Sequence, residues 1–143
     1  MPLKLDVVTI EREVYTADDV DMVVLPGAEG VMGVLPHHAP VVSALKEGVM
    51  EIKRGDQREY VAIGGGFVEV RPDGVIVMAD VAEKSDEIDE ERAERARQSA
   101  LEAIAKAPAT ADRLDAVASL RRAEIRLRVS RQKRQPSARD RAS

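Results

Sequence analysis

The sequence predicts an α+β protein in which a β sandwich or barrel precedes a two-helix hairpin. Residues 1–80 hold short β-rich runs separated by turn residues. After Asp80 the composition shifts to Ala, Glu and Arg with helical periodicity, and Pro108 divides that helical region into two. The 143 residues, 44% of them hydrophobic, suffice for one ordinary core plus an appendage. We expect a β domain over residues 1–84, a helical hairpin over 85–134 and a disordered tail over 135–143.

The β-rich runs are bounded by glycine, proline and aspartate, which favour turns. Residues 54–57 (RGDQ) and 72–74 (PDG) lie between apolar runs and predict two hairpin turns, so the flanking strands should pair antiparallel. Residues 64–66 are three glycines, which predict a bulge or close strand packing. The expected strands are residues 3–10, 20–25, 33–35, 48–53, 59–63, 67–71 and 75–79.

Two helices should follow the β domain. Asp86 or Asp89 is suited to cap the first helix, because a carboxylate accepts hydrogen bonds from free backbone N–H groups there. Pro108 should end this helix, since proline cannot continue the hydrogen-bond ladder. The apolar faces of both helices consist mostly of alanine and offer little contact area. The sequence therefore predicts a marginally stable hairpin.

Several function classes are disfavoured by the residues present. The chain has no cysteine, and its two histidines, His37 and His38, are neighbours whose side chains would point to opposite sides of an extended segment, so we predict no metal site. The N-terminus lacks a signal or transit pattern, and no apolar run approaches the ~20 residues of a membrane-spanning helix. Residues 64–66 lack the Lys-Ser/Thr of a phosphate-binding loop, and no serine is paired with a base. We predict that the chain is not an enzyme.

The charge is unevenly distributed. Residues 121–143 carry nine Lys or Arg against Glu124 and Asp140, a net +7, which leaves −11 for residues 1–120. Clustered positive charge attracts phosphates, but the chain has only three aromatic residues, and none of them lies in this tail to stack on a base. An acidic protein surface is therefore the better partner than nucleic acid.

Four segments together resemble the epsilon subunit family of bacterial and chloroplast ATP synthases, which corresponds to the delta subunit of mitochondria. They are LDVVTIEREVY near the start, GVMGVLPHHAP at 30–40, YVAIGGGFVEVRPDGVIVMAD at 60–80 and IDEERA at 88–93. The resemblance covers nearly the whole chain. It implies a flattened antiparallel sandwich of about ten strands and a C-terminal helical hairpin.

The resemblance also implies a role. The expected protein is a non-catalytic rotor subunit in the central stalk of a proton-translocating complex that makes ATP from ADP and phosphate. Its expected partners are the gamma subunit, the ring of c subunits, and the α and β subunits of the catalytic head. It would touch the membrane only through the complex, at the cytoplasmic face of the bacterial plasma membrane, and it would require no cofactor.

The family's Gly-x-x-Gly-x-x-Pro-x-His-x-Pro loop falls on residues 30–40. In relatives this end of the sandwich faces the c-ring and gamma. Some relatives carry glutamate in place of Val31 and glycine in place of His37. The resemblance implies an interface formed by Gly30, Val31, Met32, Gly33 and His38.

Some relatives bind ATP on the folded hairpin, so the resemblance implies ATP as a regulatory ligand. The residues that match their nucleotide contacts are Glu83, Ile88, Asp89, Arg92, Ala93, Arg122 and Arg126. Guanidinium groups four residues apart on one helix face suit phosphate oxygens. Ser99 stands where the best-matched relatives have a further arginine. The alternative stays open that Asp89 only caps a helix and Arg92 is solvated.

The basic second helix suggests how the tail would inhibit ATP hydrolysis. If the helices opened into line, they would reach on the order of 60 Å, into the catalytic head. The positive side chains available for an acidic segment there are Arg121, Arg122, Arg126, Arg128, Arg131, Lys133 and Arg134. A second hypothesis is a free-standing nucleotide-sensing or nucleic-acid-binding adaptor that uses the same basic tail.

Overall fold

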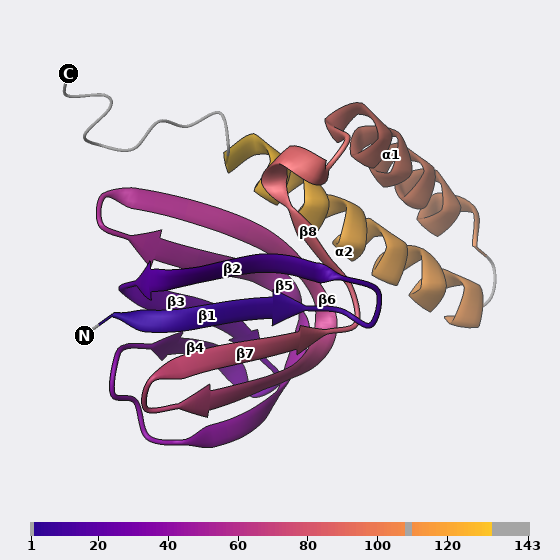
Figure 1. The fold of residues 1–143 in the computed structure, drawn as a ribbon. Helices are drawn as coiled ribbons and strands as arrows, with labels where there is room; N and C mark the ends of the chain where they lie inside the picture. The colour runs from indigo at the N-terminus through magenta and orange to yellow at the C-terminus, as the bar shows by residue number, and fades with distance from the viewer. Residues whose placement is uncertain (1, 108–109, 133–143) are drawn as a thin grey trace.

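A computed structural model describes residues 2–107 and 110–132 (Figure 1). Its strands are joined in one sheet with the order β2-β1-β7-β6-β5-β3-β4, and β8 pairs with β6. The strands are β1 (Leu3–Val8), β2 (Glu13–Val20), β3 (Met22–Gly27), β4 (Gly30–Val34), β5 (Val41–Arg54), β6 (Gln57–Arg71), β7 (Gly74–Ala79) and β8 (Ala82–Lys84).

The sheet folds into two layers because β5 and β6 are long enough to belong to both. Residues 47–54 of β5 and 57–64 of β6 pair together, with β3 alongside β5, whereas residues 66–71 of β6 pair with β7 in the other layer. The sandwich prediction is thus confirmed with eight strands. Counting the halves of β5 and β6 separately would give the expected ten.

The bend of β6 lies at the three glycines. Gly65 and Gly66 have positive φ angles of 88° and 124°, and a Cβ added at Gly66 would lie 2.3 Å from the carbonyl oxygen of Met78. Only glycine allows both this backbone conformation and this approach of β7. The close strand packing expected here is confirmed.

The core lies between the two layers. Its largest fully buried side chains come from strands of both layers: Leu3, Leu5, Leu25, Met50, Ile52 and Ile63. The strands β2 and β5, which are not neighbours in the sheet, meet where the Arg54 guanidinium of β5 binds the Asp19 carboxylate of β2, with atoms 2.8 and 3.0 Å apart. Both predicted hairpins are present, since β5 pairs antiparallel with β6 and β6 with β7.

Four features of the sheet were not predicted. No pattern in the sequence predicted β2, because this edge strand buries only Val14 and Val20 fully and carries exposed aspartates between them. The first half of β5 and the short β8 were also absent from the expected strands. One neighbouring pair, β1 with β7, is parallel within the otherwise antiparallel sheet.

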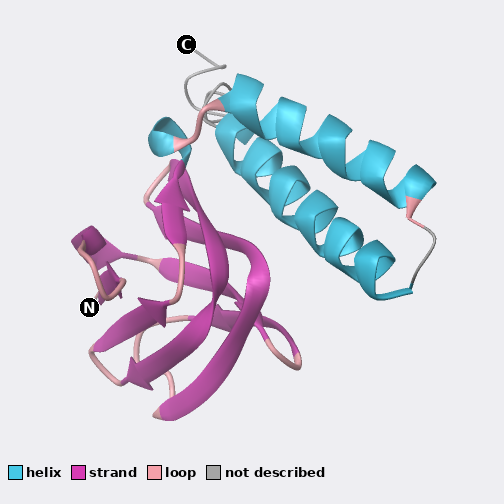
Figure 2. Cartoon of the chain, turned by 90° about the vertical axis from the view of Figure 1, so that its right-hand side faces the viewer, coloured by secondary structure: helices cyan, strands magenta, loops and turns pink. Residues whose placement is uncertain are grey.

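A single 3-10 turn (Ser85–Glu87) leads from β8 into α1 (Glu90–Lys106) and α2 (Thr110–Gln132). The helices form the predicted hairpin, and α2 lies between α1 and the strands (Figures 1 and 2). Asp89 caps α1, with its carboxylate accepting a hydrogen bond from the Arg92 N–H at 3.1 Å. Of the two cap candidates, the structure selects Asp89. Neither helix has the length and apolar character needed to cross a membrane.

Candidate functional site

The contact between α2 and the sandwich brings together most of the residues singled out in the sequence. Leu127 and Val129 of α2 are buried against Ala62 of β6. Ile88 and Ala93, which flank the start of α1, belong to the same cluster. The apolar contact area under the helix is therefore small, because two of these five buried side chains are alanines.

Two arginines of α2 form ion pairs with carboxylates of the sandwich. The Nε of Arg126 is buried and lies 2.9 Å from Glu83 Oε1, while Nη2 donates a hydrogen bond to Oε2 at 3.2 Å. Arg122, one turn earlier, lies 3.9 Å from Glu47 of β5 and is more exposed. The Nε makes no hydrogen bond in this geometry, but the Arg126 pair is closer and less exposed than the Arg122 pair, which makes it the stronger of the two.

A third arginine joins the two helices. Arg131 lies 3.4 Å from Glu90 and 3.8 Å from Glu94 of α1. Glu94 also accepts hydrogen bonds from Arg97, at 2.7 Å for the shortest, and from Gln98. These bonds, chiefly those from Arg97, lower the pKa of Glu94 to about 2. The carboxylate is therefore charged at neutral pH.

A cleft of about 170 Å³ lies beside these contacts, between the sandwich and α2. Its lining combines apolar residues with two arginines and two glutamates. The lining residues are Glu47, Ala62, Ile63, Gly64, Val81, Glu83, Arg122, Ile125 and Arg126. Such an arrangement suits a ligand with a flat apolar part and negative charge, provided that it displaces the carboxylates from the arginines.

The residues expected to bind ATP are divided between this cleft and its surroundings. Glu83, Arg122 and Arg126 line the cleft, whereas Ile88 and Ala93 are buried in the adjacent apolar cluster. Asp89 serves as the α1 cap, and the Arg92 side chain is exposed. Two hypotheses for the start of α1 therefore remain: Asp89 and Arg92 bind nucleotide, or Asp89 only caps the helix and Arg92 is solvated. The capping role is the one with a contact in the structure.

The arginines expected to bind an acidic partner also fall into two groups, those paired within this chain and those that are exposed. Arg122, Arg126 and Arg131 are paired with acidic residues of this chain. Arg121 and Arg128 are exposed. Lys133 and Arg134, like the tail 135–143, lie outside the described residues.

The loop expected at the c-ring begins as strand β4. Val31 is 78% exposed, whereas Met32 packs partly against the core. Gly30 and Gly33 are exposed, and His38 is half-buried at the turn that follows. Within the described residues, no group of three or more His, Cys, Asp or Glu side chains is placed to hold a metal ion.

Sequence reasoning missed an apolar strip on the outer face of the sandwich. Cross-strand partners place Ala44 of β5, Phe67 of β6, Met78 of β7 and Val8 of β1 in one row. Phe67 is 56% exposed, and Val42, on the same face, is 68% exposed. No local sequence pattern marks this strip, because Asp6 and Glu69 alternate with Val8 and Phe67 on the same face of their strands.

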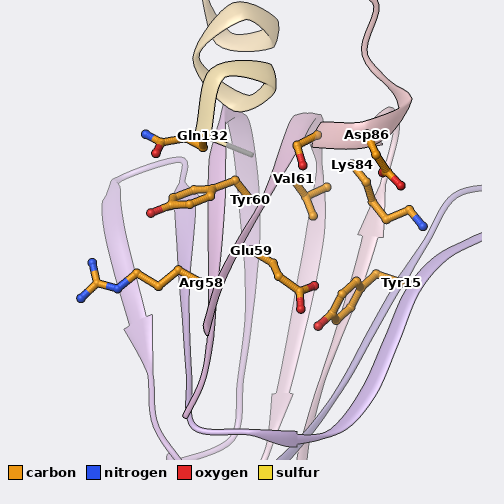
Figure 3. A pocket seen from close by; sticks show the side chains of 9 residues that line it. Tyr15, Arg58, Glu59, Tyr60, Val61, Lys84, Asp86 and Gln132 are labelled. Carbon is orange, nitrogen blue, oxygen red and sulfur yellow. The ribbon is translucent and has the colours of Figure 1, made fainter. Parts of the chain in front are cut away.

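A second cleft, of about 440 Å³, lies where β6, β8 and the end of α2 meet (Figure 3). Tyr15 and Glu59 lie next to each other on one side of it, and Tyr60 and Gln132 lie on another. Burial, together with a hydrogen bond to Glu59, raises the pKa of Tyr15 to about 12. Because Glu59 is already bound by Arg54 at 3.1 Å, we interpret this group as a structural network.

The fold and its contacts define a class of small subunit in which a β sandwich carries a docked helical hairpin. The family model described as "ATP synthase, Delta/Epsilon chain, beta-sandwich domain" matches residues 2–85, and the "long alpha-helix domain" of the same chain matches residues 86–131. The chain therefore belongs to the ATP synthase delta/epsilon chain family, whose members are non-catalytic subunits of the central stalk.

Relatives and solved structures agree with this assignment. The ATP synthase epsilon chain of Dehalococcoides mccartyi is 47% identical over 92% of this chain and 94% of its own, and that of Herpetosiphon aurantiacus is 45% identical over 94% and 98%. A chain of the Euglena gracilis mitochondrial ATP synthase (OSCP/F1/c-ring) matches with a TM-score of 0.74 and 25% identity, over 86% of this chain and 78% of that one. A chain of the Tetrahymena thermophila central stalk/c-ring assembly shares the fold, with a TM-score of 0.52 and 11% identity over 94% and 98%. This membership sets aside the free-standing adaptor.

Proposed function

We propose that this chain couples the catalytic head of a proton-translocating ATP synthase to its c-ring and inhibits ATP hydrolysis through its helices. The observation that carries the proposal is the match of both halves of the chain to one family. The structural likeness to a chain of a solved F1/c-ring assembly supports it. The peripheral position at the cytoplasmic face of the plasma membrane is part of this proposal.

We propose the outer apolar strip as the surface that binds the gamma subunit. Exposed apolar rows of this kind mark interaction sites, because burying them on a partner removes apolar area from water. The loop with Gly30, Val31, Met32, Gly33 and His38 then faces the c-ring. The exposure of Val31 at its start supports this assignment.

The basic face of α2 is proposed to bind an acidic segment of the β catalytic subunits when the helices leave the sandwich. ATP, held by Arg122 and Arg126 in the closed hairpin, would oppose that movement. At a hundred times its dissociation constant, a ligand adds about 2.7 kcal/mol to the state that binds it. High ATP should therefore relieve the inhibition.

The experiment is ATP hydrolysis by the reconstituted complex with three forms of this subunit: intact, ending after Ala107, and with the α2 arginines changed to alanine. We expect faster hydrolysis at low ATP with the two altered forms. Equal rates for all three would remove the inhibitory role. Calorimetry of the isolated chain with ATP tests the nucleotide site, which would be abandoned if Arg122→Ala and Arg126→Ala bound ATP as the unchanged chain does.

The same preparation tests the gamma-binding surface. Phe67→Asp should weaken recovery of this subunit with gamma, because it places a charge in the middle of the apolar strip. Leu114→Asp is the matched control, since Leu114 is also exposed but lies near the start of α2. An equal loss with both variants would argue against the strip as the contact.

A further inference from the structure

We propose that Glu47 and Glu83 of the sandwich form a latch that holds α2 down by occupying Arg122 and Arg126. The latch competes with any acidic partner for the same guanidinium groups. Its effect on hydrolysis rests on the proposed function, but its existence does not. The partner of the latch is thus helix α2 of the same chain, in the docked position that the structure shows.

The Arg126–Glu83 pair is the stronger half of the latch. The two side chains are 29% and 25% exposed, and the buried Nε of Arg126 faces the Glu83 carboxylate. Removing the charge of Glu83 would leave a partly desolvated guanidinium without its counter-charge, which costs more than the pair gains when formed. Glu83 is held in place by the pairing of β8 with β6, where it lies opposite Ala62.

The apolar contact that docks α2 involves few large side chains. It consists of Leu127, Val129 and the partly buried Ile125 of α2 on the strand residues Ala62, Val49 and Tyr60. The contacts of α2 with the strands lie in its C-terminal half, and the far end of the hairpin projects away from them (Figure 2). A helix anchored at one end through few large side chains depends on its polar contacts to stay docked.

The competition follows from the donors of a guanidinium. The Nη2 of Arg126 donates to Glu83, and Nε lies 2.9 Å from the same carboxylate, so a second carboxylate cannot occupy this edge of the guanidinium while Glu83 is there. An acidic segment must therefore displace Glu83 before it binds this edge of Arg126. In this sense the sandwich already presents the carboxylates that an acidic partner would offer.

The test uses the full chain without nucleotide. Because the sequence has no cysteine, Gln57→Cys and Arg113→Cys give unique spin-label sites on the exposed β5–β6 turn and near the start of α2. Electron-resonance distance measurements should show one population for this labelled chain. Glu83→Gln should raise the ratio of undocked to docked helix about tenfold, in line with the loss of a partly buried pair. Glu47→Gln should raise it less.

Glu69→Gln is the matched control, because Glu69 also binds an arginine, Arg71 at 3.0 Å, but within β6. It should leave the distances unchanged. The double variant Glu83→Gln with Arg126→Gln should show a smaller effect than the two single changes added together, as expected for residues that interact. A Glu83→Gln chain with unchanged distances would overturn the latch.

A second measurement separates the latch from the proposed function. In the reconstituted complex at low ATP, Glu47→Gln should inhibit hydrolysis more than the unchanged subunit, and ending the chain after Ala107 should abolish this difference. Altered distances combined with unaltered hydrolysis would support the latch and count against the inhibitory role. Unaltered distances would count against the latch whatever the rate of hydrolysis.

Discussion

His37 adopts a left-handed backbone conformation, with a φ of 65°, in a turn that the His38 N–H closes on the Leu35 carbonyl at 3.2 Å. Proline followed by a residue with positive φ is the pattern of a type II turn, where glycine is preferred. The left-handed conformation costs a non-glycine residue about 1–2 kcal/mol. Glycine avoids this strain but loses about 0.5–1 kcal/mol more conformational entropy on folding. We expect His37→Gly to stabilise the chain by about 0.5–1 kcal/mol in denaturant unfolding.

The control for this change is the neighbouring residue. His38 has no positive φ, and its Nδ1 lies 2.8 Å from the Ala39 carbonyl oxygen, so glycine there brings its entropic cost and removes this contact without relieving strain. We expect His38→Gly to destabilise the chain by about 0.5–1 kcal/mol. A shift of both variants in the same direction would show that the turn does not strain His37.

At the scale of the element, the start of α1 depends on one side chain. The Asp89 carboxylate binds the Arg92 N–H, whereas Asp86 is exposed in the preceding 3-10 turn. Replacing a capping aspartate by alanine costs about 1 kcal/mol. We expect Asp89→Ala to destabilise the hairpin by this amount, measured as faster amide hydrogen exchange in the first turns of α1.

Asp86→Ala is the matched control, because it removes the same carboxylate from a position without a cap. Its effect should stay within about 0.5 kcal/mol. Equal effects of the two changes would mean that negative charge near the helix start, and not the cap, provides the stability.

At the scale of the whole molecule, the sandwich should fold without the hairpin. The largest fully buried side chains all lie before Lys84, and α2 covers only a few residues of β5 and β6. We expect a chain ending at Lys84 to unfold cooperatively. A chain ending at Asp80 lacks β8, which pairs with Val61, Ala62 and Ile63, and should be less stable by about 1–2 kcal/mol.

Chemical denaturation of both shortened chains beside the full chain measures this order. Non-cooperative unfolding of the chain ending at Lys84 would mean that the helices are needed for the sandwich. Equal stability of the two shortened chains would assign β8 to the hairpin and not to the sheet.

The sequence by itself determined the local elements of this protein. The turns at 54–57 and 72–74, the glycines at 64–66 and the end of α1 before Pro108 follow from backbone preferences of a few adjacent residues, which tertiary contacts did not override. The edge strand β2 was missed because only one face of it is buried, and its aspartates hide the apolar alternation. The family resemblance likewise rested on local segments, and both domain models bear it out.

Only the tertiary structure decided which of these elements meet. The pairing of Arg126 with Glu83 joins residues 43 positions apart, and the outer row of Ala44, Phe67, Met78 and Val8 joins four strands. Neither follows from local sequence, because strand order and register, which no short segment encodes, bring these side chains together. The choice between Asp86 and Asp89 also required the structure, since both are aspartates that suit a cap and only the backbone path selects one.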